Sequence, residues 1–262
     1  MKNAVLLLVL VAVTTFTAQA LDVGWSGSEA DKSWDTDSNW WNGTANLAPT
    51  QSDRVLIRDG NWWPGTGPHV NSGVTALADS LEVGLTGRKD ANGYLFIDGG
   101  QLDVTTTVKM AIQANDSTGT INLNSGVMNV GGNYYGGWYG AATTNIYGGS
   151  LNVGGWLVIG QFASSSGSVV NVNGGELGCS WLGGEGVLNL AGGTLVINQT
   201  ADKRSGLQAM AAAGDIIAYN GDPNASFEYT FDGTKTTMTA VPEPTVLVML
   251  GIGSLSLLIK RK

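Results

Sequence analysis

The sequence predicts an all-β protein, a right-handed parallel β-helix (β-solenoid), and three features of residues 93–198 support this. One pattern recurs five times. Apolar residues alternate with polar ones on either side of a turn, and glycine occupies the turn in every copy. The copies read GYLFIDGGQLDV, GTINLNSGVMNV, ATTNIYGGSLNV, SVVNVNGGELGC and GVLNLAGGTLVI, and they begin at Gly93, Gly119, Ala142, Ser168 and Gly186.

The spacing of the copies indicates stacked repeats. The second turn residues are Gly100, Gly126, Gly149, Gly175 and Gly193, so successive steps are 26, 23, 26 and 18 residues. A period in this range is typical of repeats too small to bury their own apolar face. Alternation with a period of two favours strands over helices, and paired glycines favour sharp corners. We therefore predict two strands and a corner in each copy.

A third strand is expected in each coil, at residues 81–83, 108–112, 156–159 and 180–182. Three short strands joined by corners would place residues 81–200 in parallel coils with inward ladders of Val, Ile and Leu. The alternative is an antiparallel β-sandwich of hairpins, because two strands around a Gly pair can also form a hairpin.

Different segments flank the coils. Residues 21–80 carry Trp25, Trp34, Trp40 and Trp41 and are expected to cap the open end of the solenoid; exposed rings could instead stack on sugars. Residues 201–240 are expected to close the other end. Within them we predict a helix at 205–213 ended by Gly214, strands at 216–219, 227–231 and 236–241, and a hairpin at Asp232-Gly233.

Charge limits the possible partners. Of 13 basic residues in the chain, four lie before Leu21 or after Glu243, which leaves nine against 21 acidic residues between these two positions, a net charge of about −12. A nucleic-acid partner is not expected, because it would require a cationic face. An anionic polysaccharide would also be repelled unless divalent cations bridge the two.

No catalytic constellation is evident, so we expect a non-enzymatic protein without cofactor or metal. Between Gly93 and Asn198 the only cation is Lys109, and the acids are Asp98, Asp103, Asp116, Glu176 and Glu185. Asp98 and Asp103 stand where other copies have Asn, and they are not expected to form a ladder. The single histidine, His69, is expected to be an ordinary loop residue, and Cys179 a small apolar filler. A polysaccharide lyase or hydrolase remains an alternative, although nothing singles out a pair of carboxylates.

Aromatic residues give the coils a possible binding function. Tyr134, Trp138, Trp156 and Trp181 all follow the second strand of successive copies. Aligned on one face, they would form a strip suited to glycan chains, such as exopolysaccharide. Alternatively they belong to the core or the corners, since Tyr and Trp bury large apolar areas.

Both termini resemble targeting segments. Residues 1–20 have the parts of a signal peptide: Lys2, an apolar stretch at 4–13, and Ala18-Gln19-Ala20 as the cleavage site. Residues 241–262 begin with Val241, Pro242, Glu243 and Pro244, continue with an apolar run expected to form a hydrophobic helix, and end with Lys260, Arg261 and Lys262. The basic end should remain cytoplasmic. A plain tail anchor is the simpler alternative.

This tail resembles the PEP-CTERM sorting signal of Gram-negative bacteria in its Pro-Glu-Pro motif, hydrophobic helix and terminal basic cluster. The resemblance implies an exosortase-type membrane peptidase as partner and a link to exopolysaccharide. It also implies a precursor held transiently in the inner membrane and a mature protein at the cell surface or outside the cell. The Gly-rich coils are similar to autotransporter-associated β-strand repeats, which implies architecture only.

Overall fold

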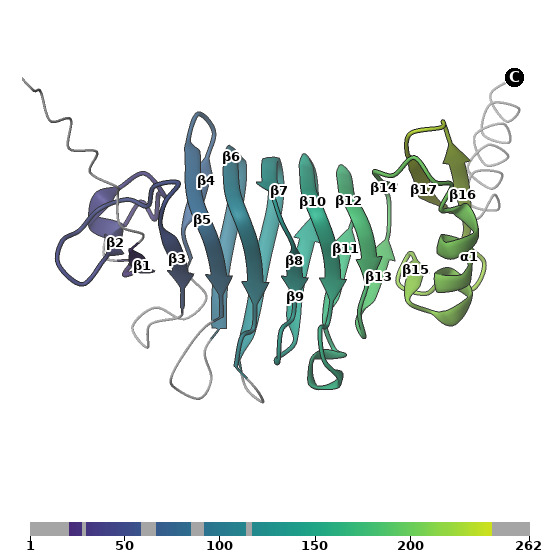
Figure 1. Ribbon diagram of the computed structural model, residues 1–262, viewed down its shortest axis with the longest axis horizontal. Helices are drawn as coiled ribbons and strands as arrows, with labels where there is room; N and C mark the ends of the chain where they lie inside the picture. Colours follow the sequence, from purple (N-terminus) through teal and green to yellow (C-terminus); the bar gives the residue numbers. More distant parts are fainter. Residues whose placement is uncertain (1–20, 28–29, 59–66, 85–91, 114–116, 243–262) are drawn as a thin grey trace, which may run out of the picture.

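The computed structural model describes residues 21–27, 30–58, 67–84, 92–113 and 117–242 and shows a β-solenoid. Strands make up 53% of the described residues and stack in about 6 turns. Successive turns follow one another along the long axis (Figure 1). The predicted parallel coils are therefore confirmed, and the antiparallel sandwich is wrong, because the repeats pair strand on strand in parallel rather than as hairpins.

Each turn contributes up to three strands, which build three faces of the column. The first face consists of β4 (His69–Asn71), the start of β6 (Asn92–Met110), the start of β7 (Thr118–Val130), β9 (Ala142–Ile146), β11 (Val169–Val172), β13 (Val187–Leu190) and β15 (Ile216–Ala218). The second face consists of the start of β5 (Thr75–Val83), the middle of β6, the end of β7, the starts of β10 (Ser150–Ile159) and β12 (Glu176–Gly183), and β14 (Thr194–Ile197).

The third face consists of β1 (Asp22–Trp25), β3 (Arg54–Ile57), the ends of β5 and β6, β8 (Tyr134–Gly136), and the ends of β10 and β12. Parallel stacking thus begins before the coils predicted at 81–200, with β1 and β3. The predicted third strands at 81–83, 108–112, 156–159 and 180–182 all belong to this face, although the second ends at Met110.

Inward side chains form the core, as the alternating pattern predicts. On the first face, Ile97, Leu123, Ile146, Val172 and Leu190 occupy successive turns in register and are almost fully buried. Cys179 occupies an inward position on the second face, where burial raises the pKa of its thiol to about 12. It is the small apolar filler that the sequence predicts.

The corner glycines stack directly on one another. A Cβ built on Gly149 would lie 2.0 Å from the carbonyl oxygen of Gly126, and a Cβ on Gly175 would lie 2.3 Å from that of Gly149. Gly149 also has a φ of +74°, which a side chain would strain. No other residue fits between turns that approach this closely.

The N-terminal end is covered by tryptophans. The 3-10 helix η1 (Asp37–Asn39) leads into β2 (Trp40–Trp41), which pairs antiparallel with β1. Trp34 and Trp40 are buried with ring centroids 4.7 Å apart, and the indole of Trp40 donates a hydrogen bond to the Trp34 carbonyl. These two residues pack against the column as the capping hypothesis expects, whereas Trp41 is exposed.

At the other end, a helix and a hairpin cover the last turn (Figure 1). Helix α1 (Arg204–Ala213) ends at Gly214, and β16 (Ser226–Phe231) and β17 (Thr236–Val241) form the predicted hairpin. Strand β17 pairs antiparallel with β14, which closes the second face. Helix α1 follows β14 at the point where the chain would otherwise continue into a third-face strand. A second 3-10 helix, η2 (Ala163–Ser165), lies in the loop after β10.

Candidate functional site

The third face carries the exposed aromatic residues of the coils. Each of its strands has two outward positions, one on either side of an inward residue. One outward column runs through Ser80, Thr107, Asn133, Trp156 and Trp181, and the other through Glu82, Lys109, Tyr135 and Val158. Because strands stack in register, side chains in one column are neighbours about 4.8 Å apart. The tryptophans thus occupy the last two places of their column.

Trp156 and Trp181 form an exposed pair. Their side chains are 56% and 47% exposed, their ring centroids lie 5.9 Å apart, and the rings are tilted by 32°. The backbone amide of Trp156 donates a hydrogen bond to the side-chain oxygen of Asn133 in the preceding turn. A rigid backbone therefore presents two adjacent indole surfaces to solvent.

Tyr134 does not belong to this surface, which corrects its assignment as a glycan-binding residue. Its side chain is fully buried, and its hydroxyl lies 2.6 Å from the Thr144 hydroxyl and donates to the Met110 sulfur. Burial raises the pKa of the phenol strongly. The reason is strand β8, which the sequence analysis missed: Tyr134 is its inward residue, and it pairs with inward Leu157.

Trp138 lies in a second aromatic cluster, formed with Tyr135, Tyr139 and Phe162. Trp138 meets Tyr135 and Phe162 edge-on, at centroid distances of 4.6 and 5.8 Å. Tyr139 and Phe162 stack at 4.8 Å and are 40% and 39% exposed. Phe162 was not predicted, because it lies in the loop after β10 outside the repeated pattern. Only the stacking of turns brings it to Tyr139.

Each aromatic group has a lysine beside it. The Lys109 ammonium lies 4.7 Å from the centroid of the Trp138 ring, and the Lys203 ammonium lies 4.6 Å from that of Trp181. Such contacts are favourable because the face of an aromatic ring is electron-rich. Glu82, the neighbour of Lys109 in the preceding turn, is committed to Arg54 through two hydrogen bonds of 3.1 and 2.7 Å.

A groove adjoins Trp181 at the end of the third face. It has a volume of about 240 Å³ and is lined by Ser180, Trp181, Leu182, Ile197, Lys203, Gly206, Leu207 and Met210. The groove exists because α1 covers the last turn without continuing the strand stack. Its lining is mostly apolar, with the Lys203 ammonium as its charged group.

The first face, in contrast, is covered by a ladder of side-chain hydrogen bonds. Each asparagine amide group donates to the oxygen of the asparagine one turn earlier: Asn145 to Asn122 at 2.9 Å, Asn171 to Asn145 at 2.9 Å, and Asn189 to Asn171 at 3.0 Å. The amide group of Asn189 also donates to Asn220 at 2.7 Å. The side-chain amides of these asparagines therefore find hydrogen-bond partners in one another.

Asp98 and Asp103 do not recur as carboxylates in later turns, as the sequence indicates, but each accepts a hydrogen bond from an asparagine of the next turn. Asn129 donates to Asp103 at 2.8 Å, Asn152 donates to Asn129 at 3.0 Å, and Asn124 donates to Asp98 at 2.7 Å. An ionised carboxylate only accepts hydrogen bonds. In these ladders each side chain donates to its neighbour in the preceding turn, so a carboxylate fits the turn nearest the N-terminus. His69 lies at the end of such a row, with its Nδ1 2.7 Å from Asp98, and stacks on Phe96.

Several predicted features lie outside the described residues: the signal peptide at 1–20, Glu243, Pro244, the hydrophobic helix, and Lys260, Arg261 and Lys262. Val241 ends β17, and Pro242 follows it, exposed. Among the residues that the structure describes, no helix combines the length and apolar character needed to cross a membrane. The same residues contain no group of three or more metal-ligating side chains.

Comparison with known proteins gives no relative for this chain. No protein-family model matches it, and neither a curated protein nor a solved structure does.

Proposed function

We propose that this chain is an exported, non-enzymatic protein of the cell surface or extracellular matrix, sorted through its C-terminal Pro-Glu-Pro motif. In this proposal an exosortase-type membrane peptidase processes a precursor that is held transiently in the inner membrane of a Gram-negative bacterium. The mature protein then presents its aromatic third face outside the cell.

The supporting observation is the position of Pro242 relative to the last strand of the described residues. Val241 pairs with Ser226 at the open end of the β16–β17 hairpin, and the motif begins at the next residue, Pro242, which is exposed. Proline cannot donate a backbone hydrogen bond, so it ends strand pairing at this point. A peptidase could therefore reach Pro242, the first residue of the motif, without unfolding the column.

The test is removal of the tail. Deletion of residues 242–262 should abolish processing and surface retention, as measured by cell fractionation and the mass of the product. Glu243→Gln should impair processing, whereas Glu228→Gln, the same change at an exposed carboxylate in the hairpin, should leave it unchanged. Identical fractionation of the truncated and full chains would contradict the proposal.

The second candidate function is glycan binding, and the exposed Trp156–Trp181 pair favours it. Exposed aromatic rings of this size are costly to leave in water and often mark binding surfaces. The axial C–H groups of a sugar ring carry partial positive charge and pack well on the electron-rich face of an indole. Two such rings in adjacent turns would contact consecutive sugars of a linear chain.

A further inference from the structure

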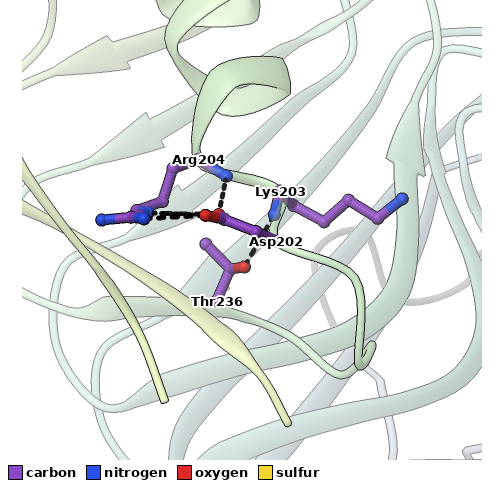
Figure 2. Close-up of polar contacts among 4 residues, drawn as sticks. All are labelled: Asp202, Lys203, Arg204 and Thr236. Carbon is purple, nitrogen blue, oxygen red and sulfur yellow. Dashed lines mark hydrogen bonds and ion pairs between the residues drawn. The ribbon is translucent and has the colours of Figure 1, made fainter. Parts of the chain in front are cut away.

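The charges around the Trp156–Trp181 pair indicate which glycans it would select. Lys203 places its ammonium 4.6 Å from the Trp181 ring centroid. Its neighbour Asp202 does not neutralise it, because the Asp202 carboxylate binds the Arg204 guanidinium at 2.8 Å. Figure 2 shows the Lys203 side chain extending away from that ion pair.

The backbone fixes the position of Lys203. Its amide donates a hydrogen bond of 3.0 Å to the hydroxyl of Thr236, the first residue of β17, which is fully buried (Figure 2). Lys203 is also the N-terminal capping residue of α1, so the helix and the hairpin together hold it at the rim of the groove. The ammonium is therefore placed next to the indole by two elements that cover the end of the column.

The adjoining strands add no negative charge. In the third-face strand residues 107–110, 134–136, 156–159 and 181–183, the only charged side chain is Lys109, which contacts the other aromatic cluster. Lys109 and Lys203 are thus both cations, although the chain as a whole carries a net negative charge. At physiological ionic strength the Debye length is about 8 Å, so a ligand group at this surface experiences mainly its near neighbours.

We propose that Trp156, Trp181 and Lys203 form a binding site for a polysaccharide containing carboxylated sugars. The sugar rings pack on the two indoles, and a uronate carboxylate at the Trp181 end pairs with the Lys203 ammonium. The groove of about 240 Å³ beside Trp181 is smaller than the about 300–1,000 Å³ of drug-sized ligand pockets, so it accommodates part of one sugar unit while the chain continues over the surface. This inference rests on the second candidate function, glycan binding.

The experiment is affinity gel electrophoresis of the full chain, with polygalacturonate as the acidic polymer and dextran as the neutral one. Polygalacturonate should retard the wild-type chain. Trp156→Ala and Trp181→Ala should each weaken that retardation about 30-fold, as expected for aromatic anchors. Lys203→Gln should weaken it about tenfold and reduce its sensitivity to salt, as expected for loss of one charge-assisted contact.

Two matched controls separate the site from general effects. Trp41→Ala removes an indole that is 48% exposed at the other end of the column, and it should leave retardation unchanged. Lys235→Gln removes the same charge from an exposed position in the hairpin turn, and it should also have no effect. Circular dichroism of every variant should match the wild type, since all five side chains are exposed or at the surface.

The outcomes distinguish the inference from the function on which it rests. Absence of retardation in both gels would remove glycan binding altogether. Retardation by dextran that Lys203→Gln does not alter would leave glycan binding in place and overturn the acidic specificity. Equal losses for Lys203→Gln and Lys235→Gln would show a non-specific charge effect and would also overturn the proposal.

Discussion

On the first face of the column, Asn145, Asn171 and Asn189 hydrogen bond to one another from turn to turn, whereas on the third face Trp156 and Trp181 stand 56% and 47% exposed. Both faces are built from the same stacked backbone and the same inward apolar ladders. The difference is that the outward asparagines hydrogen bond to one another, whereas the two outward tryptophans leave much of their ring surface exposed to solvent. The first face stabilises the column, and the third face leaves two indoles exposed, the surface that the proposed glycan binding would use.

The largest expected effect tests the stacking that both faces share. Gly149→Ala should reduce the free energy of unfolding by about 3 kcal/mol or more, because its Cβ would lie 2.0 Å from the Gly126 carbonyl oxygen at a positive φ. Gly183→Ala, on the third face, should change it by less than about 0.5 kcal/mol, because a Cβ there meets nothing within 4 Å. Urea denaturation measures both, and equal effects would contradict this account of the corner.

A smaller effect tests the ladder of the first face. Asn171→Asp should lower the free energy of unfolding by about 1–2 kcal/mol, because a carboxylate cannot donate to Asn145 and places two oxygens together. Asp103→Asn should cost less than about 0.5 kcal/mol, because an amide oxygen still accepts from Asn129. If both substitutions were neutral in urea denaturation, the ladder would contribute nothing, and the contrast between the faces would be lost.

The smallest effect concerns the hairpin that closes the second face. The Asp232 carboxylate accepts hydrogen bonds from the Thr234 hydroxyl and from the amides of Thr234 and Lys235, which lowers its pKa to about 2. Because the folded-state pKa lies below the usual value of about 3.9, the stabilisation is complete above that value. It is lost as the pH falls toward 2.

Asp232→Ala should therefore lower the denaturation midpoint slightly at neutral pH and have a much smaller effect at pH 2, where the carboxylate is about half protonated. Thr234→Val, which removes the strongest of these hydrogen bonds, should move the carboxylate pKa upward in an NMR titration. A difference between wild type and Asp232→Ala that persists unchanged at pH 2 would exclude this role.

Much of the fold was predictable because strand alternation and glycine spacing are local properties. The Gly-cornered copies, the helix ended by Gly214 and the hairpin at Asp232-Gly233 all appear as predicted. Strand β8 was missed because it is three residues long and follows a Gly-Gly-Asn sequence that resembles a loop. Because of that omission Tyr134 was considered a possible glycan-binding residue, whereas the alternative, packing in the core, is what the structure shows.

The sequence by itself determined the repeat, the inward apolar positions and the motifs at both ends, because each depends on residues close together in the chain. Only the tertiary structure decided which aromatic residues are exposed, because exposure depends on the register between turns more than 20 residues apart. It also decided that α1 covers the last turn beside Trp181 and that the backbone at its start holds Lys203 against that ring. The physical reason is that neither contact is made within a repeat, so no pattern within one copy could predict it.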